Sequence, residues 1–268
     1  MNIAVITGAS SGMGKEFVKQ LDAIANLDEI WMIARSEEKL NAINFATNAV
    51  KRPIPLDLTT PEAFHYIKML LAFEKPCIRM LINCAGFGLC GRVDELDHDA
   101  QSEMIDLNCK ALMSLTKLCV PYMEKGSRII ELSSAGAFLP QPEFAVYAAS
   151  KAFVLSFGRA LYRELLPKHI YVTTVCPGPV DTPFFKTASK DGKPAGMKKY
   201  FVVKPEKVVS HALKTSILKK ELAIYGLPMK ALYAASHLPL AELMIFETKC
   251  KTCVNRDAPK IRTHRNNL

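Results

Sequence analysis

A glycine-rich turn near the start of the chain constrains its fold more than any other feature. The octapeptide at 7–14, Thr-Gly-Ala-Ser-Ser-Gly-Met-Gly, follows an apolar run at 3–6 and precedes a segment at 15–21 with apolar residues at helical spacing. This pattern predicts a strand-to-helix turn, where free N–H groups and the helix dipole suit a pyrophosphate. The alternative is an ordinary glycine turn, because G-x-x-x-G-x-G differs in spacing from the G-x-G-x-x-G dinucleotide pattern.

Apolar strands and amphipathic helices alternate after this turn. Further strands are expected at 29–34, 54–56, 78–82, 128–132, 170–175 and 222–225. The alternation predicts an α/β fold, a doubly wound parallel sheet of about seven strands with helices on both faces. At 268 residues and 49% hydrophobic content, without a linker or repeat, residues 1–268 are predicted to form one Rossmann-like domain.

Ligands of such sheets bind beyond the carboxyl ends of the strands. Several polar or glycine-containing segments fall at these predicted ends, so one crevice is expected to collect them. They are Gly8 to Gly14, Arg35, Asp57, the segment Asn83-Cys84-Ala85-Gly86, Ser134 and the pair Pro177-Gly178.

Tyr147 and Lys151 are four residues apart in a predicted helix, which places them on one face, one turn apart. A free tyrosine has a pKa of about 10, too high for efficient acid–base catalysis at neutral pH. A cation nearby lowers it, and an oxidised nicotinamide ring would add more positive charge. The alternative is an unrelated Tyr and Lys on a long helix.

Two further polar residues point to the same chemistry. Ser134 ends a predicted strand, where its hydroxyl can reach the same reacting oxygen or simply cap a turn. Asn108 lies in a predicted helix, where an amide is unfavourable unless it bonds backbone or water. Together with the glycine turn, these residues indicate that a carbonyl is held, protonated and reduced.

In this order, the motifs resemble those of the short-chain dehydrogenases/reductases. The match covers most of residues 1–182 and ends with Tyr147-Ala148-Ala149-Ser150-Lys151 and Pro177-Gly178; from Pro183 onward it is loose. The resemblance implies a Rossmann fold, a nicotinamide coenzyme and a catalytic tetrad of Asn108, Ser134, Tyr147 and Lys151. Cys84 departs from the commoner asparagine.

The resemblance also implies roles for single residues. Tyr147 acts as general acid in reduction and base in oxidation, Ser134 binds the carbonyl oxygen, Lys151 binds ribose and Asn108 positions a water. Asp57 contacts the adenine, Asn83 and Gly86 line the coenzyme cleft, and Val180 and Thr182 meet the carboxamide. The complete set of predicted coenzyme contacts is Gly8, Ser10, Ser11, Gly12, Met13, Gly14, Arg35, Ser36, Asp57, Asn83, Ala85, Gly86, Tyr147, Lys151, Pro177, Gly178, Val180 and Thr182.

The coenzyme is predicted to be NADP(H). In this architecture an acidic residue at the end of the second strand accepts the ribose hydroxyls of NAD, whereas an arginine accommodates a 2′-phosphate. Here Arg35 and Ser36 follow that strand, and no acidic group is obviously placed to repel a phosphate. The alternative is a solvated surface arginine.

The predicted substrate is a secondary alcohol or ketone, bulky and apolar like a hydroxysteroid or bile acid. Apolar residues without a carboxylate clamp flank the expected pocket, although they equally suit a core. They are Phe87, Phe138, Leu139, Phe144, Phe184 and Phe185, and residues 183–200 are the expected substrate loop. One alternative is a reductase of 3-oxoacyl thioesters or of carbonyl compounds in general. A second is an extended-type epimerase or dehydratase, but the chain is short for such an enzyme. A third is a non-catalytic protein that binds NADP(H) as a sensor or scaffold.

The formal net charge is +9, and residues 247–268 hold six basic and two acidic residues, a net +4. No basic, aromatic-interleaved stripe indicates nucleic acid. The C-terminal region at 227–268 begins with an apolar segment at 227–246, which polar residues interrupt too often for it to span a membrane. This segment is expected to pack on the core or on a neighbouring subunit, and the protein is expected to be a homodimer or homotetramer. Peripheral membrane contact is the minority alternative.

The eight cysteines are scattered through mostly apolar segments, which favours reduced thiols. Cys250 and Cys253 form the one suggestive pair, but zinc needs further ligands and His264 is a weak candidate, so no metal site is predicted. Met1 leads directly into the first strand without a signal-like segment, and a cytoplasmic protein is expected.

Overall fold

The computed structural model describes residues 1–21, 26–43, 48–188 and 201–238. Within these ranges seven strands form one parallel sheet in the order β3-β2-β1-β4-β5-β6-β7. The strands are β1 Asn2–Thr7, β2 Glu29–Ala34, β3 Val50–Pro55, β4 Cys77–Asn83, β5 Arg128–Leu132, β6 Tyr171–Val175 and β7 Leu222–Ala223. This arrangement confirms the predicted doubly wound parallel sheet.

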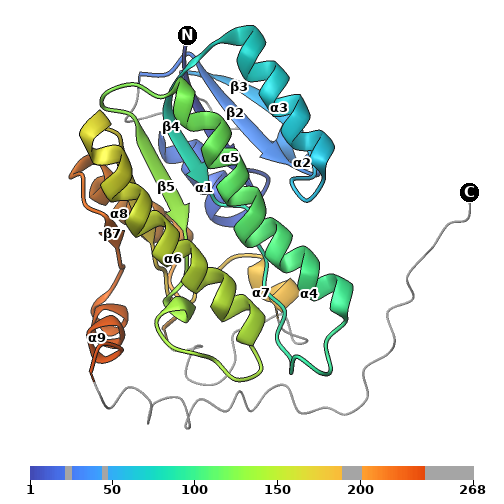
Figure 1. Cartoon of the computed structure of the whole chain (residues 1–268), viewed down its shortest axis with the longest axis vertical. Helices are drawn as coiled ribbons and strands as arrows, with labels where there is room; N and C mark the ends of the chain where they lie inside the picture. The colour runs from blue at the N-terminus through green and yellow to red at the C-terminus, as the bar shows by residue number, and fades with distance from the viewer. Residues whose placement is uncertain (22–25, 44–47, 189–200, 239–268) are drawn as a thin grey trace, which may run out of the picture.

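The helices in the described ranges cover both faces of this sheet. They are α1 Gly12–Leu21, α2 Glu37–Asn41, α3 Pro61–Glu74, α4 His98–Ile105, α5 Leu112–Cys119, α6 Ala145–Leu165, α7 Phe184–Ala188, α8 Pro205–Ile217 and α9 Leu227–Ala235. In Figure 1, α5 and α6 lie in front of the sheet, and α1 and α8 lie behind it. None of these helices is long and apolar enough to cross a bilayer.

Two apolar cores follow from the alternation of side chains along the strands. In β1, Ala4 and Ile6 pack with α1 and α8, whereas Ile3 and Val5 pack with α3, α5 and α6. Both faces of the strand are therefore buried, which explains why it is a continuous apolar run rather than an alternating one.

Two predicted element boundaries were wrong. β3 begins at Val50 instead of Ile54, because β3 is the edge strand, where Pro53 and Pro55 are tolerated. β7 is only two residues long. Between α4 and α5, a π-helical turn, Asp106–Ala111, joins the two helices without interruption.

Candidate active site

The glycine turn between β1 and α1 has the geometry that the sequence predicts. Gly8 and Gly12 have φ angles of +65° and +52°, which side chains disfavour. A Cβ at Gly14 would overlap the Gly8 carbonyl group, so the turn closes only with glycine there. A Cβ at Gly8 would lie 3.0 Å from the Ala85 backbone nitrogen, which places this turn beside the segment that follows β4.

Thr7 connects these two segments and was not among the predicted site residues. Its hydroxyl oxygen accepts hydrogen bonds from the backbone N–H groups of Cys84 and Ala85, both at 3.0 Å. Its position as the last residue of β1 could have identified Thr7, because a hydroxyl there lies beside the end of the neighbouring strand. A small cavity lies next to Thr7 and the segment after β4; it is lined by Thr7, Leu58, Asn83, Ala85, Leu107, Ala111 and Leu112.

Asn83 borders that cavity, but its amide is turned into the protein interior rather than the cleft. The Nδ2 group donates to Thr116 Oγ1 at 2.9 Å and to Glu131 Oε1 at 3.2 Å. Glu131 is fully buried, and burial raises its pKa to about 8 against the lowering effect of Lys151 and of the hydrogen bonds that Asn83 and Thr116 donate to it. The Asn83 side chain thus has a structural role, and its contact with the coenzyme cleft stays a prediction.

Tyr147 and Ser134 come together at the carboxyl edge of the sheet. Tyr147 is 7% exposed near the start of α6, and Ser134 follows β5, where its Oγ accepts the Gly136 N–H at 3.0 Å. Burial raises the pKa of Tyr147 to about 12, although a hydrogen bond with Ser134 lowers it. Burial is the larger effect, so a net lowering of the Tyr147 pKa by Lys151 is not seen.

Lys151 is also buried, one helical turn from Tyr147. Its Nζ donates to the Leu132 carbonyl at 2.9 Å and lies 5.9 Å from the centroid of the Tyr147 ring. Burial lowers the pKa of Lys151, while nearby thiols and Glu131 raise it. A Cβ at Gly86 would lie 3.2 Å from this nitrogen, so the loop after β4 also reaches Lys151.

Asn108 lies in the π-helical turn and is fully buried. Its Nδ2 donates to the Phe87 carbonyl at 2.9 Å and to Ser150 Oγ at 3.0 Å, and its Oδ1 accepts the Phe87 N–H at 3.0 Å. The side chain therefore fixes the loop after β4 to α6. The water contact that the sequence argument gave it stays a prediction.

An aromatic wall surrounds the Tyr147 ring. Phe144 stacks on it with centroids 4.3 Å apart, and Phe184 of α7 lies 5.5 Å away. A Cβ at Gly88 would lie 2.8–3.0 Å from all three rings, so these rings close around Gly88. Gly88 was missed by the sequence argument, because a lone glycine outside a motif carries no signal of its own.

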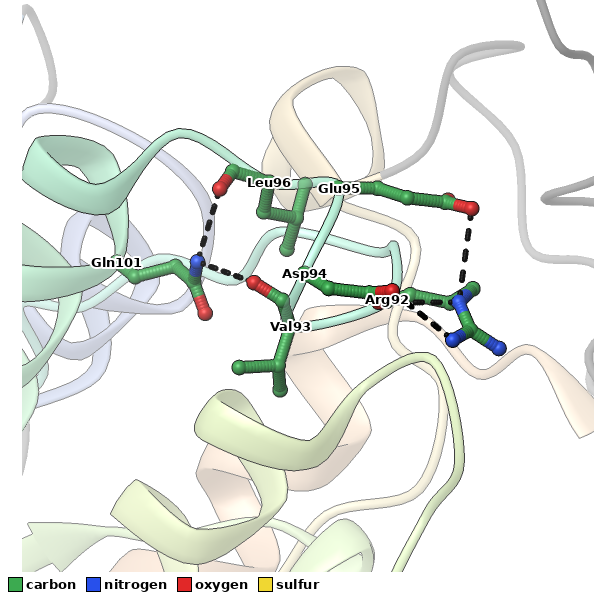
Figure 2. A network of polar contacts seen from close by, with 6 residues as sticks. All are labelled: Arg92, Val93, Asp94, Glu95, Leu96 and Gln101. Carbon is green, nitrogen blue, oxygen red and sulfur yellow. Dashed lines mark hydrogen bonds and ion pairs between the residues drawn. The ribbon is translucent and has the colours of Figure 1, made fainter.

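The remainder of this loop is held in place by polar contacts, as Figure 2 shows. Gln101 of α4 donates to the carbonyl groups of Val93 and Leu96, at 3.1 and 3.0 Å. Arg92 binds both carboxylate oxygens of Asp94 at 3.0 Å and lies 3.5 Å from Glu95. The segment from Gly88 to the start of α4 is thus anchored beside the aromatic wall.

The residues predicted to contact the 2′-phosphate and the adenine of the coenzyme each have a polar partner within the protein. Arg35 is 69% exposed at its side chain and lies 3.5 Å from Glu103, an acidic group that the sequence argument did not place there. Ser36 Oγ caps α2 by accepting the Lys39 N–H at 3.3 Å. Asp57 accepts from the N–H and the hydroxyl of Thr59; these bonds and Arg35 lower its pKa against burial.

The loop after β6 lies against the glycine turn, as predicted. A Cβ at Gly12 would lie 3.3 Å from the Thr182 side chain, and Val180 pairs with Val203. A Cβ at Gly178 would lie 2.7 Å from Met229 Sδ of α9, a contact that the sequence argument missed. Of the expected substrate loop, only the part up to Ala188 and not residues 189–200 is described.

Comparison with known proteins decides the family. The family model for short chain dehydrogenases matches residues 2–193. This chain is a short-chain dehydrogenase/reductase. It is accordingly an oxidoreductase that acts on CH–OH or C=O groups of small molecules and binds a nicotinamide coenzyme.

Among the curated relatives of this dehydrogenase, an uncharacterized oxidoreductase of Staphylococcus epidermidis is 31% identical over 183 residues, 68% of this chain and 79% of that protein. A very-long-chain 3-oxoacyl-CoA reductase of Rattus norvegicus is 31% identical over 185 residues, 65% of this chain and 58% of that longer protein.

Solved structures share the fold. A short-chain dehydrogenase from Sphingobium yanoikuyae in complex with NADPH has a TM-score of 0.77 and 26% identity, covering 91% of this chain and 95% of that one. A relative from Burkholderia phymatum in complex with NAD has a TM-score of 0.76 at 17% identity, again over 91% and 95%, and shows the fold alone. Both coenzymes therefore occur on this fold.

Proposed function

We propose that this dehydrogenase interconverts a secondary alcohol and a ketone with NADP(H). The observation that carries the proposal is the convergence of Ser134, Tyr147 and Lys151 at the carboxyl edge of the sheet, beside the glycine turn. A protein that only binds the coenzyme has no need of this hydroxyl pair.

The coenzyme supplies or accepts the hydride. In the direction of reduction, the Tyr147 hydroxyl donates its proton to the substrate oxygen, and the Ser134 hydroxyl donates a hydrogen bond to the same oxygen. Burial raises the pKa of Tyr147 to about 12, which keeps the hydroxyl protonated at neutral pH, as a proton donor must be. Lys151 and the positive charge of an oxidised nicotinamide both favour the phenolate and bring this pKa down.

The choice of NADP(H) is supported by Arg35 at the end of β2. A guanidinium there suits the planar recognition of a 2′-phosphate. Glu103 competes for it, but the pair is exposed and 3.5 Å apart, so it contributes little energy and a phosphate with its larger charge can displace the carboxylate.

The bulky apolar substrate is supported by the rings of Phe144 and Phe184 around Tyr147. The second candidate is a 3-oxoacyl thioester, which the similarity to the rat 3-oxoacyl-CoA reductase favours. Its long acyl chain would use the same aromatic wall.

The test is the oxidation of NADPH, followed by absorbance, with ketosteroids, 3-oxoacyl thioesters and small ketones. We expect turnover with a bulky ketone that exceeds turnover with acetone, and the Tyr147→Phe variant as the inactive control. Turnover with 3-oxoacyl thioesters alone would select the second candidate. Coenzyme binding without turnover on any of these carbonyls would contradict the proposed reaction.

A further inference from the structure

Helix α9 lies beside the entrance to the site, and one of its faces contacts the body of the protein. Met229 packs against Gly178 in the loop after β6. Tyr233 meets Phe138, just after Ser134, with ring centroids 5.0 Å apart. Figure 1 shows α9 at the lower left, beyond β7 and toward the end of the sheet to which β5 points.

The opposite face of α9 is apolar and exposed. Leu227, Ala231, Ala234 and Leu238 follow one another at intervals of four, three and four residues, so they form one stripe along the helix and the turn after it. Leu227 is 81% exposed and Leu238 is 57% exposed, and no residue of α9 is buried. Of residues 227–238, one face therefore packs on the body of the protein and the other is exposed, while packing on a neighbouring subunit stays a prediction.

Basic side chains lie on α9 and next to it. Lys230 is exposed on α9, which has no acidic residue. Lys214 of α8 and Lys220 lie close enough to Lys230 that all three lower the pKa of His211, after the larger effect of burial. The chain as a whole has a net charge of +9.

This combination distinguishes between possible occupants of the stripe. A second copy would bring an equally basic surface against it, and like charges oppose that contact. An anionic bilayer offers both a layer that accepts leucine side chains and a surface that attracts lysines within a Debye length. Charge complementarity therefore selects lipid.

We propose that the apolar stripe of α9 docks on an anionic lipid surface, with Lys230 at the level of the headgroups. Because the other face of α9 contacts Gly178 and Phe138, docking places the entrance of the site at the bilayer, where apolar alcohols and ketones concentrate. This consequence rests on the proposed substrate class. The docking itself does not.

The test is flotation of the full chain with vesicles of phosphatidylcholine, with and without phosphatidylglycerol, at about 0.1 M and about 1 M salt, where the Debye length falls from about 10 Å to about 3 Å. We expect binding to the anionic vesicles at low salt and release at high salt. Leu227→Ser with Leu238→Ser should weaken binding at least about tenfold, and Lys230→Gln about fivefold.

Phe73→Ser on α3 is the matched control, because Phe73 is 86% exposed but lies away from α9; it should leave binding unchanged. Coenzyme binding and turnover of a water-soluble ketone by each variant check the fold and measure the proposed function independently of docking. The docking proposal is overturned if anionic vesicles do not bind the chain, or if Phe73→Ser weakens binding as much as the stripe variant. It is also overturned if the stripe variant only lowers the molar mass in solution, which would assign the stripe to a second copy.

Discussion

The two halves of the sheet's carboxyl edge are built differently. In the half around β1 and β4, glycine backbone and the Thr7 hydroxyl set the geometry, and positive φ angles or close approaches explain Gly8, Gly12 and Gly14. In the half around β6, α7 and α9, the geometry comes from packing of Phe144, Phe184 and Met229. Positions whose backbone geometry requires glycine form a motif that can be recognised in the sequence. Apolar residues that only pack together can replace one another, so they form no such motif.

The family model covers residues 2–193, which include the coenzyme half and, of the packed half, β6 and α7 but not α9. Four substitutions separate the contributions of the two halves, and we order them by the effect expected.

Tyr147→Phe should have the largest effect, because Tyr147 is proposed to contact both the coenzyme and the substrate. The substitution keeps the ring between Phe144 and Phe184 but removes the proton donor. We expect kcat to fall by about 10²–10⁴-fold while the coenzyme Kd stays unchanged. Steady-state kinetics and coenzyme fluorescence measure the two quantities, and near-normal kcat in a folded variant would refute the role of Tyr147.

Glu131→Gln tests strand β5, which lies between β4 of the coenzyme half and β6 of the packed half. Glu131 pairs in register with Asn83 of β4 and Thr174 of β6, and Glu131 Oε2 and Thr174 Oγ1 have no hydrogen-bond partner. The folded pKa of about 8 lies above the ordinary value of 4.5, so the native state binds the extra proton. The contribution of Glu131 to stability is then fully present below pH 4.5 and is lost as pH rises through 8.

We expect the free energy of unfolding to fall by at most about 1.4 kcal/mol per pH unit within this window on account of Glu131. Glu131→Gln stays neutral, so the difference in unfolding free energy between variant and parent should grow with pH. Urea unfolding at pH 5, 7 and 8.5 measures it. Parallel pH profiles of the two proteins would show that Glu131 is ionised in the native state.

Arg35→Ala tests the coenzyme half alone. A charged hydrogen bond to a 2′-phosphate contributes about 1.5–3 kcal/mol, and exposure of Arg35 places its effect near the lower end, about tenfold in the KM for NADPH. NADH use should change little. Glu103→Gln is the matched variant: freed from its ion pair, Arg35 should bind NADPH more tightly, and an unchanged KM in both variants would exclude Arg35 from coenzyme choice.

The sequence predicted most of the fold, and the proximity of Tyr147 and Lys151, for a common physical reason. β1 and β2 contain continuous apolar runs, and Tyr147 and Lys151 belong to one helix, so local spacing determines their arrangement. Local spacing carries no information on desolvation, and burial therefore raises the pKa of Tyr147 although Lys151 is one turn away.

Contacts between residues distant in the chain were not predicted. Glu103 lies beside Arg35 although 68 residues separate them, and the Asn83 amide donates to Glu131 and Thr116. The π-helical turn at Asn108 has no periodicity that distinguishes it from a helix boundary. Such contacts arise only when the sheet order brings the elements together.

Gly88→Ala tests the packed half and should have the smallest effect. The added methyl group would approach the rings of Phe144, Tyr147 and Phe184 within 2.8–3.0 Å, so these rings must shift by a few tenths of an ångström. Overpacking costs at least about 1 kcal/mol, which corresponds to about a fivefold loss in kcat/KM for a bulky ketone. Coenzyme Kd should not change, because none of the rings belongs to the glycine turn. The same loss of kcat/KM with acetone would mean that the shift of the rings misplaces the Tyr147 hydroxyl itself. A loss confined to bulky ketones would mean that the aromatic wall contacts the substrate, since only a large group reaches Phe144 and Phe184.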